Sequence, residues 1–400
     1  MSTGPAVSSE RVKALLITGA YYPPQVGGIS HLLAKIVATL GPDHVCCLTA
    51  VPTDKAVDAV AVGPAVYRFP SLLGHSRISK AAAWGTALTM IMARNRPRVI
   101  MLGSAIDSSW GLWLRRRLRL PFIVFVYGNE ILAAVSGEYE QARLAFKFAN
   151  RVVACSKFTA KLAERAGIDP GRIQVIYPGC DTEIFRPLPV RKDLRERLLG
   201  PRNDIQVILT VGNLVARKGH DMVIRCLPIL MNRVPDFVYL IVGDGPYRET
   251  LEDLAKEIGV SDRVIFAGKL PDEDIPDIHA LSDVFVMPSR EHLEEESVEG
   301  FGMVFLEANA CNKPVIGGRA GGIPEAVEDG VTGLLVDPHS PPEIAEALAR
   351  LLTDGDFAHR LGTQGRARVV REFQWSQVGE RILTLLRTVQ AEGQTSDIGG

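Results

Sequence analysis

The chain has 400 residues, of which 46% are hydrophobic, and its 45 basic and 46 acidic side chains leave a net charge of −1. This length is too great for one ordinary hydrophobic core and favours two domains. The balanced charge argues against a general nucleic-acid-binding protein, which would be strongly basic.

No stretch of the sequence has the pattern of a targeting or membrane-spanning segment. Residues 1–11 are polar and lack the apolar core of a signal peptide. The longest apolar stretch, residues 81–93, is interrupted by Trp84, Gly85 and Thr86 and is too short to span a bilayer. The six cysteines form no CxxC pair, which predicts reduced, buried thiols. We therefore expect a cytoplasmic protein and leave peripheral contact with the inner membrane face open.

The first half of the chain alternates short β-branched and apolar runs with longer amphipathic segments. Strands are predicted at residues 13–18, 44–49, 98–102, 122–126, 151–154 and 173–177. Helices are predicted at residues 29–40, 78–93, 108–118, 138–150 and 157–166. Strand, helix and strand in this order indicate parallel βαβ units.

The pattern pauses at residues 181–203, which are rich in charge and proline, and we place the domain linker there. It restarts with strands predicted at residues 205–211, 237–242, 263–266, 284–287, 314–316 and 332–336. Helices are predicted at residues 219–232, 246–258, 275–280, 302–311 and 342–352.

The fold class predicted from this order is α/β, with two facing Rossmann-like parallel-sheet domains and a cleft between them. The N-terminal domain is expected at residues 1–190 and the C-terminal domain at 191–374. Residues 375–400 are expected to form a helix to about Gln390, which crosses back to the N-terminal domain, and then a disordered tail. Ligands of such sheets usually bind at the carboxyl ends of the strands.

The strongest functional signal is the segment at residues 298–307, in which seven residues separate Glu299 from Glu307. A predicted strand ends before it, and a predicted helix begins near Gly302. The free amides at a helix start favour an anion, and carboxylates on either side can accept hydrogen bonds from sugar hydroxyls. The spacing alone is equally consistent with a capped helix that carries a surface Glu307.

The E-x7-E segment with its internal Gly-Phe-Gly resembles the retaining GT-B glycosyltransferases of the large group that includes sucrose synthases and bacterial phosphatidylinositol mannosyltransferases. Several ordered motifs carry this resemblance across nearly the whole chain, which is more specific than any single match. They lie at residues 23–28, 173–181, 211–219, 242–246 and 321–325.

The resemblance implies roles for residues in both halves. Glu307 would hold the ribose hydroxyls of a nucleotide-sugar donor, and Glu299 would contact hydroxyls of the transferred sugar. Lys218 would stabilise the diphosphate leaving group, and Lys269 would lie where the base is read. The other donor-binding residues implied are the amides of Phe301, Gly302 and Met303, together with Gly27 and Gly28 in a loop that approaches the phosphates or the acceptor.

Departure of the diphosphate builds negative charge, which a preorganised cation stabilises. Cations are disfavoured at a helix N-terminus, so Arg217 and Lys218 at a predicted helix start suggest an anionic ligand, although a solvated helix start would also explain them. No metal or cofactor is then expected beyond the donor. Gly27 and Gly28 have a plainer explanation as an ordinary β-to-helix turn.

Two positions depart from the pattern of the group. Asn213 stands where an arginine is usual, and the segment after residue 126 has Asn129 where a histidine is common. Asparagine forms hydrogen bonds but brings no charge. The predicted catalytic set is therefore Lys218, Glu299, Asn213 and Asn129, with Arg217 as a partial substitute for the missing arginine or as a solvent-facing side chain.

Weaker signals have plainer explanations. Asp272-Glu273-Asp274 matches the DxD pattern of metal-dependent transferases, but acidic residues are ordinary in a first helical turn. His31, just past the glycine loop, is the histidine we would test. Residues 113–119 mix apolar and basic side chains that could touch anionic lipid headgroups, or could simply form a helix end.

The leading hypothesis is transfer of a hexose to a hydroxyl acceptor, a lipid or a glycan, with GDP-mannose as the first donor and a UDP-hexose as the second. The main alternative is a catalytically weak nucleotide-sugar-binding subunit, because of Asn213 and the missing histidine. An epimerase or phosphorylase of the same fold is a third. A nicotinamide dehydrogenase is a fourth, and it rests only on the Gly243-Asp244-Gly245 turn.

Overall fold

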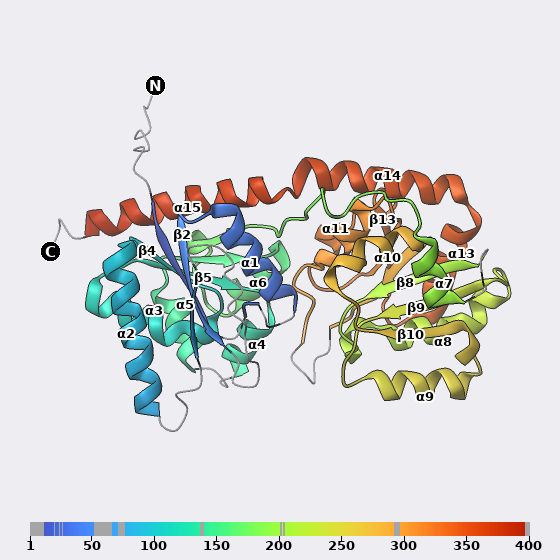
Figure 1. Ribbon diagram of the computed structural model, residues 1–400, viewed down its shortest axis with the longest axis horizontal. Helices are drawn as coiled ribbons and strands as arrows, with labels where there is room; N and C mark the ends of the chain where they lie inside the picture. The colour runs from blue at the N-terminus through green and yellow to red at the C-terminus, as the bar shows by residue number, and fades with distance from the viewer. Residues whose placement is uncertain are drawn as a thin grey trace. The chain divides into compact units, whose positions relative to one another are not determined.

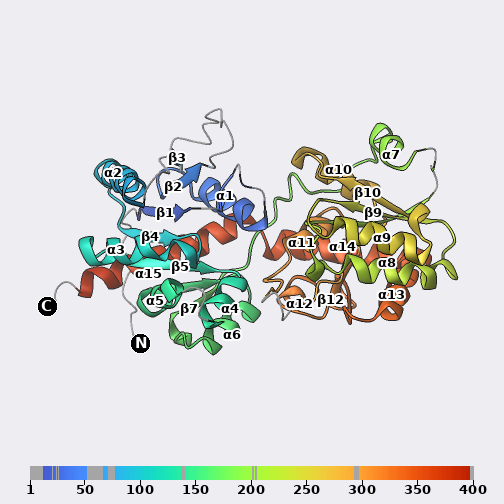
Figure 2. The ribbon, with the colours of Figure 1, turned by 90° about the horizontal axis from the view of Figure 1, so that it is seen from below.

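The computed structural model describes residues 12–19, 21–23, 25, 27–51, 66–70, 77–136, 140–200, 202, 205–291 and 297–396. The chain divides into two compact units, each built on its own parallel sheet (Figures 1 and 2). Unit 1 consists of residues 1–155, 159–178 and 375–400, and unit 2 consists of residues 156–158 and 179–374. The C-terminal helix therefore belongs to unit 1.

In the described part of unit 1, seven parallel strands form the sheet in the order β3-β2-β1-β4-β5-β6-β7. Their central members are almost wholly apolar and fully buried, as expected for a parallel sheet that is covered on both faces. The strands are β1 (Ala14–Thr18), β2 (Val45–Val51), β3 (Val66–Pro70), β4 (Val99–Leu102), β5 (Phe122–Val126), β6 (Arg151–Ala154) and β7 (Ile173–Val175).

Helices cover both faces of this sheet. One face packs against α2 to α6 through a continuous apolar core, whereas α1 and α15 pack against each other on the opposite face (Figures 1 and 2). The helices are α1 (Gly28–Leu40), α2 (Arg77–Asn95), α3 (Ser108–Leu118), α4 (Asn129–Ser136), α5 (Glu140–Phe148), α6 (Lys157–Arg165) and α15 (Trp375–Ser396), with short 3₁₀ turns η1 (Ala105–Asp107) and η2 (Pro170–Arg172).

In the described part of unit 2, six parallel strands form the sheet in the order β10-β9-β8-β11-β12-β13. Its largest apolar core lies between the sheet and α8, α9, α13 and the start of α14. The strands are β8 (Gln206–Val211), β9 (Phe237–Val242), β10 (Val264–Gly268), β11 (Val284–Met287), β12 (Val315–Gly318) and β13 (Gly333–Val336).

The helices of unit 2 alternate with these strands, and short 3₁₀ turns precede some of them. The helices are α7 (Lys192–Leu199), α8 (His220–Met231), α9 (Arg248–Ile258), α10 (Ile275–Leu281), α11 (Met303–Ala310), α12 (Ile323–Ala326), α13 (Pro341–Thr353) and α14 (Gly355–Glu372); the turns are η3 (Ala216–Lys218), η4 (Ser261–Arg263) and η5 (Asp272–Asp274).

Several elements differ from the sequence-based expectation. Edge strand β3 and helix α4 were not predicted, and α7 lies inside the segment expected as a linker. The helix expected at residues 138–150 is α5. The expected tail is wrong in part, because α15 is helical to Ser396, and residues 397–400 lie outside the described residues.

Helix α14 was missed because its glycines lower helix propensity. They are explained by close packing: a Cβ atom at Gly362 would lie 2.1 Å from the carbonyl oxygen of Asn312, and one at Gly365 would lie 2.4 Å from the amide of Asn309.

Both sheets reverse their strand order at one point, between β1 and β4 in unit 1 and between β8 and β11 in unit 2. The chain leaves neighbouring strands in opposite directions there, which opens a crevice at their carboxyl ends where ligands bind in doubly wound sheets. In unit 2 the loops at this point begin at Gly212 and Pro288.

No helix in the described part is both long enough and apolar enough to cross a membrane. All six cysteines are free thiols buried in the two units.

The turn that follows β8 depends on a glycine, and this generates a first prediction. Gly219 has φ +76°, and a Cβ atom there would lie 2.3 Å from the carbonyl oxygen of Pro288. Gly259 has nearly the same φ, +78°, but a Cβ atom there would meet nothing within 4 Å. Gly259→Ala should therefore lower the free energy of unfolding by about 1 kcal/mol, the cost of the left-handed backbone alone.

Gly219→Ala should cost clearly more, because the backbone of the β11 loop must also move away, a strain of about 1–3 kcal/mol. Urea unfolding of both variants measures the difference. If both variants lose the same free energy of unfolding, the contact between Gly219 and Pro288 does not constrain this edge of the sheet.

Candidate active site

The predicted donor residues of unit 2 gather at the carboxyl edge of its sheet. Lys218 lies in η3, between β8 and α8, and Glu299 lies in the loop between β11 and α11. These are the two loops that flank the switch point of the sheet, so the topology brings together residues that are 81 positions apart in the chain.

A single carboxylate oxygen joins the charged residues of this site. Oε2 of Glu299 accepts a hydrogen bond from Nζ of Lys218 at 2.5 Å and another from Nη1 of Arg217 at 2.7 Å. All three side chains are largely buried. Arg217, for which the sequence left two orientations open, therefore points to Glu299 and not to solvent.

The electrostatics of this cluster keep Glu299 charged. Burial by itself would raise the pKa of Glu299, but Lys218 and Arg217 outweigh it and lower that pKa to about 2. Burial also lowers the pKa of Lys218, and the attraction to Glu299 opposes this shift. The carboxylate is ionised throughout the neutral range, with two cations held beside it.

The loop after β11 is bonded to the turn that carries the two cations. The amide of Arg290, just after β11, donates to the carbonyl oxygen of Arg217 at 2.8 Å. The Arg290 guanidinium in turn pairs with Asp221 in the first turn of α8, with Nη2 and Oδ2 3.0 Å apart and both side chains less than 10% exposed. This buried ion pair was not predicted from the sequence, since no motif spacing marks it.

His220 is a second residue that the sequence analysis missed, although it directly follows the Arg217-Lys218-Gly219 motif. Its Nδ1 lies 3.2 Å from the hydroxyl of Tyr239, and that hydroxyl lies 2.9 Å from Oγ1 of Thr210. Its Nε2 lies 3.4 Å from the carbonyl oxygen of Asn213. Burial lowers the pKa of His220 to about 4, so it is a neutral support of the loop after β8.

The start of α11 provides backbone donors beside Glu299. Gly302 precedes the helix with φ +92°, and its carbonyl oxygen accepts the amide of Phe305 at 3.1 Å. Phe301 is buried, with its ring 5.8 Å from that of Phe373, and Met303 begins the helix. The first amides of a helix have no partner inside it and favour an anion.

Glu307 lies in the second turn of α11 and is partly buried. Burial, together with the negative charge of nearby Asp272, raises the pKa of Glu307 to about 7. Hydroxyl groups that donate hydrogen bonds would favour its ionised form. Lys269 directly follows β10 and is exposed. Asn213 follows β8, and its side chain is also exposed.

One residue of the acidic run matching the DxD pattern forms ion pairs with arginines at and just before α7. Asp274 pairs with Arg191, which precedes α7, at 3.2 Å, and with Arg197 at 3.6 Å. In the described residues, no group of three His, Cys, Asp or Glu side chains is arranged to hold a metal ion.

The remaining predicted residues lie in unit 1, also at the carboxyl edge of its sheet. Gly27 precedes α1 and Gly28 begins it, after β1, while His31 lies in its first turn. A Cβ atom at Gly27 would meet nothing within 4 Å, so the backbone there is open to a ligand. Asn129 begins α4 after β5 and is exposed.

Buried carboxyl groups stand beside these loops and were not found from the sequence. Asp107, after β4, accepts the amide of Gly19 at 2.9 Å, and Glu130 accepts the amide of Tyr127. Burial raises the pKa of each carboxyl to about 7. Asp107 joins the loop after β4 to the loop after β1, whereas the Glu130 bond lies within the segment after β5.

Two family profiles match most of the chain. The sequence profile described as "Glycosyl transferases group 1" matches residues 192–368, and the profile "Glycosyltransferase Family 4" matches residues 26–184. The chain is 34% identical over 380 residues to a "GDP-mannose-dependent alpha-(1-6)-phosphatidylinositol monomannoside mannosyltransferase" of Mycolicibacterium smegmatis, covering 93% of this chain and 97% of that protein.

The chain belongs to the group 1 glycosyltransferases. A protein of the same description from Mycobacterium tuberculosis is 33% identical over 94% of this chain and 98% of its own. This glycosyltransferase also has the GT-B fold. Anabaena Alr3699/HepE, solved with UDP and glucose, superposes with a TM-score of 0.78 at 23% identity, over 94% of this chain and all of that one.

Sucrose-phosphate synthase of Thermosynechococcus elongatus superposes equally well, with a TM-score of 0.78, 24% identity, and coverage of 96% of this chain and all of that one. The expected fold and family are thus confirmed, and the chain is a nucleotide-sugar glycosyltransferase. The dehydrogenase suggested by the Gly243-Asp244-Gly245 turn is set aside.

The Arg290–Asp221 pair generates the second prediction. Asp221→Ala leaves a buried guanidinium without its partner, which typically costs about 3–5 kcal/mol. Arg290→Met in the same chain should restore part of that loss, because neither charge then remains buried alone. Chemical denaturation of the single and double variants measures both effects. If the double variant loses as much free energy of unfolding as the two single variants added together, the pair is not coupled.

Glu307 generates the third prediction. An unfolded glutamate titrates near 4.5, whereas Glu307 titrates near 7, so rising pH ionises the unfolded state first and lowers stability across this interval. A glutamine side chain at this position has no proton to lose. Glu307→Gln should therefore leave stability unchanged near pH 4 and raise it near pH 8 by up to about 3 kcal/mol, at about 1.4 kcal/mol per pKa unit.

Thermal unfolding at both pH values measures this difference, and Glu249→Gln on the surface of α9 is the control. The ribose role is tested separately by calorimetry, in which Glu307→Ala should weaken nucleoside diphosphate binding without unfolding the protein. Unchanged nucleotide affinity would contradict the ribose assignment.

Proposed function

We propose that this glycosyltransferase moves a mannosyl group from GDP-mannose to a hydroxyl of a phosphatidylinositol-based glycolipid, with retention of anomeric configuration and without a metal ion. The supporting observation is near full-length similarity to GDP-mannose-dependent phosphatidylinositol monomannoside mannosyltransferases. A UDP-hexose is the second candidate donor.

The Glu299 cluster has the chemistry that such a transfer needs. Breaking the bond between the sugar and the diphosphate leaves negative charge on the departing phosphate oxygen. Lys218 and Arg217 are preorganised cations at the switch point of the sheet, and we assign leaving-group stabilisation to them together with the amides at Gly302. This charge makes a metal ion unnecessary in the proposed reaction.

The two carboxylates have separate tasks in this proposal. Glu299 uses Oε2 to hold both cations, and we assign its other oxygen to a hydroxyl of the transferred sugar. Glu307 lies in the second turn of α11, and we assign it to the ribose hydroxyls. Lys269 lies beside the base, and the Gly27–Gly28 turn of unit 1 approaches the phosphates or the acceptor.

Asn213 and Asn129 motivate the alternative of a catalytically weak nucleotide-sugar-binding subunit. Both are uncharged, and both are exposed. The contact between Arg217 and Glu299 favours the active enzyme, because it places a second cation beside Lys218 where the family usually relies on an arginine at position 213. We assign the two asparagines to hydrogen bonds that position the reacting groups.

The fourth prediction tests the leaving-group role. Removing a preorganised donor to a developing anion costs about 2.7–4 kcal/mol, so Lys218→Ala should lower kcat by two to three orders of magnitude. Lys256→Ala, at an exposed position on α9, is the control that should retain activity. A folded Lys218→Ala enzyme with normal turnover would overturn the placement of the active site.

Asn213→Arg adds the cation that is usual in the group. Nucleoside diphosphate affinity should rise in this variant. Turnover rises as well if the pocket has room, and it falls if Asn213 contacts an acceptor group or a sugar hydroxyl. Measuring affinity and turnover together separates these cases, and an unchanged affinity would mean that position 213 does not face the diphosphate.

The fifth prediction concerns the reaction itself. Incubation with GDP-mannose and a phosphatidylinositol mannoside should give an α-linked product by NMR, and EDTA should leave the rate nearly unchanged. A rate lost with EDTA and restored by magnesium or manganese would contradict the metal-free proposal. Binding of GDP without product from any acceptor would instead support the weak-subunit alternative.

A further inference from the structure

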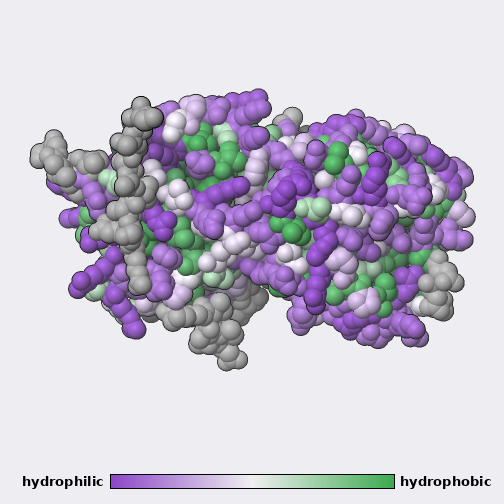
Figure 3. Space-filling model, turned by 90° about the horizontal axis from the view of Figure 1, so that it is seen from above, coloured by the Kyte–Doolittle hydropathy of each residue, from purple (hydrophilic) through white to green (hydrophobic). Residues whose placement is uncertain are grey.

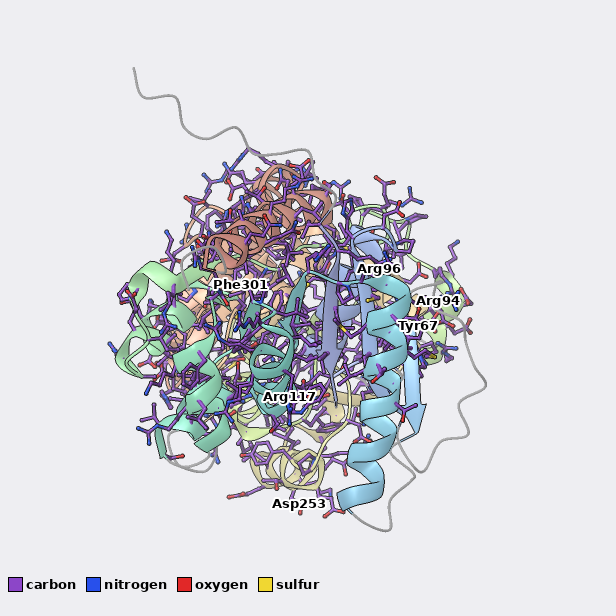
Figure 4. All side chains as sticks on the ribbon, turned by 90° about the vertical axis from the view of Figure 1, so that its left-hand side faces the viewer. Tyr67, Arg94, Arg96, Arg117, Asp253 and Phe301 are labelled. Carbon is purple, nitrogen blue, oxygen red and sulfur yellow. The ribbon has the colours of Figure 1, made fainter. Side chains whose placement is uncertain are left out.

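Two glycines flank Phe301 in the segment assigned to the diphosphate in the proposed function, residues 299–303, which we call the donor loop. Gly300 and Gly302 stand on either side of it, and Gly302 has φ +92°. Glycine restricts the backbone least of all residues, so the amides at the start of α11 need another anchor to stay in one position. The ring of Phe301, which is labelled in Figure 4, is that anchor, because Phe301 is only 3% exposed.

The ring of Phe301 packs against that of Phe373, the residue that ends α14. The two ring centroids lie 5.8 Å apart, with the ring planes at 49° to each other, and Phe373 is also 3% exposed. The backbone of Phe373 is held on both sides. Its amide donates to the carbonyl oxygen of Val369 at 3.0 Å, and its carbonyl oxygen accepts the amide of Cys180 at 2.7 Å. The anchor of the donor loop therefore rests on a ring whose own position is fixed.

Arg368, in the same helix, connects Phe373 to α12. Its Cζ lies 5.1 Å from the centroid of the Phe373 ring, which is within the range of a cation–π contact. Its Nη1 and Nη2 donate to the carbonyl oxygens of Ala326 and Glu325, at the end of α12, at 3.0 and 2.9 Å. Its Nε pairs with Glu372 at 3.1 Å, and its side chain is 17% exposed. One guanidinium thus holds both a ring and a helix end.

The turn before α12 is the second contact of the donor loop. The amide of Gly322 donates to the carbonyl oxygen of Glu299 at 2.9 Å. A Cβ atom at Gly321 would lie 2.4 Å from that same oxygen, and one at Gly322 would lie 2.0 Å from the carbonyl oxygen of Gly300. Backbone therefore lies directly on backbone here. Because Arg368 holds the end of α12, it reaches the donor loop through this turn as well as through the aromatic contact.

Helix α14 carries this support on a packed element. It lies along α11 on one side of unit 2 (Figure 1), with the close glycine contacts described above. Its other face is solvated: Thr363, Gln364 and Arg371 are exposed, and Figure 3, which looks onto this side of unit 2, shows a largely hydrophilic surface. Groups held by packed helices keep their positions better than groups on loops. The ring at the end of α14 is therefore suited to hold a glycine-rich loop.

We propose that Phe373 and Arg368 are positioning residues for the transfer, which hold the amides of the donor loop where they stabilise the departing diphosphate. Neither side chain is assigned a contact with the donor. They act through the ring of Phe301 and through the turn before α12. Donors aimed at a developing charge are effective when they need no reorganisation during the reaction. The inference rests on the proposed function of the donor loop and names the residues on which that loop depends.

The first test compares two buried phenylalanines of α14. Phe373→Leu removes the ring contact with Phe301, and a displacement of about 1 Å can cost about 100-fold in rate, so kcat should fall about 10- to 100-fold. The donor KM should change much less, because the groups assigned to the ribose and the base are untouched. The matched control is Phe357→Leu, which should keep its kcat. Phe357 also lies beneath an arginine, Arg360, but it packs in the core on the side of α8 and α13.

A second pair of variants tests the arginine. Arg368 and Arg360 each lie 5.1 Å from the centroid of a phenylalanine ring of α14. Arg368→Gln should lower kcat and Arg360→Gln should not, because Arg368 also holds the end of α12. Phe373→Met is the conservative variant. Its flexible apolar side chain can contact the Phe301 ring through sulfur, so it should retain most of the wild-type kcat.

Hydrogen exchange measured by mass spectrometry follows the donor loop without any substrate. The amides of Phe305 and Gly322 donate to carbonyl oxygens of this loop, at Gly302 and Glu299, so their exchange depends on its position. Both amides should exchange faster in Phe373→Leu than in a Phe357→Leu protein of equal global stability. This measurement needs no acceptor. If the wild-type protein transfers no mannose, that result counts against the proposed function, and the exchange still tests the support of the loop.

The inference is overturned if folded Phe373→Leu has the same kcat as Phe357→Leu, because the ring then only stabilises the fold. It is also overturned if the two amides exchange equally fast in both variants, because the loop then keeps its position without the ring. If Phe373→Leu does not fold, Arg368→Gln and Arg360→Gln provide the same comparison, and equal kcat values of those two variants overturn the inference.

Discussion

The candidate site of this glycosyltransferase depends on one carboxylate that holds two cations. Glu299 lowers the electrostatic repulsion between Lys218 and Arg217, which would otherwise be costly so far from solvent. The cluster is therefore neutralised only in part, with one more positive than negative charge. That excess positive charge, fixed in position before a ligand arrives, is what a departing diphosphate requires.

The rest of unit 2 keeps this cluster in place. The Arg290 backbone holds the turn that carries the cations, and the buried Arg290–Asp221 pair anchors the start of α8 to the loop after β11. Gly219 lets those two loops approach to a distance that a side chain would prevent. These contacts all cross the switch point between β8 and β11, so the strand order of the sheet determines where the charge is concentrated.

Unit 1 contributes a different kind of surface. At the carboxyl edge of its sheet, buried Asp107 ties the loop after β4 to the loop after β1, and buried Glu130 binds a backbone amide within the segment after β5. Helices α3 to α5, on one face of its sheet, carry basic and exposed apolar side chains.

Much of this protein was predictable from the sequence alone. Alternating apolar runs and amphipathic segments predicted two parallel sheets, since burial on both faces requires unbroken apolar strands. The E-x7-E segment predicted that Glu299 and Glu307 flank a helix start, because that relation is local. The tertiary structure decided the rest. Arg217 faces Glu299, and Asp221 pairs with Arg290, only because β8 and β11 are neighbours, and no spacing along the chain records which strands adjoin.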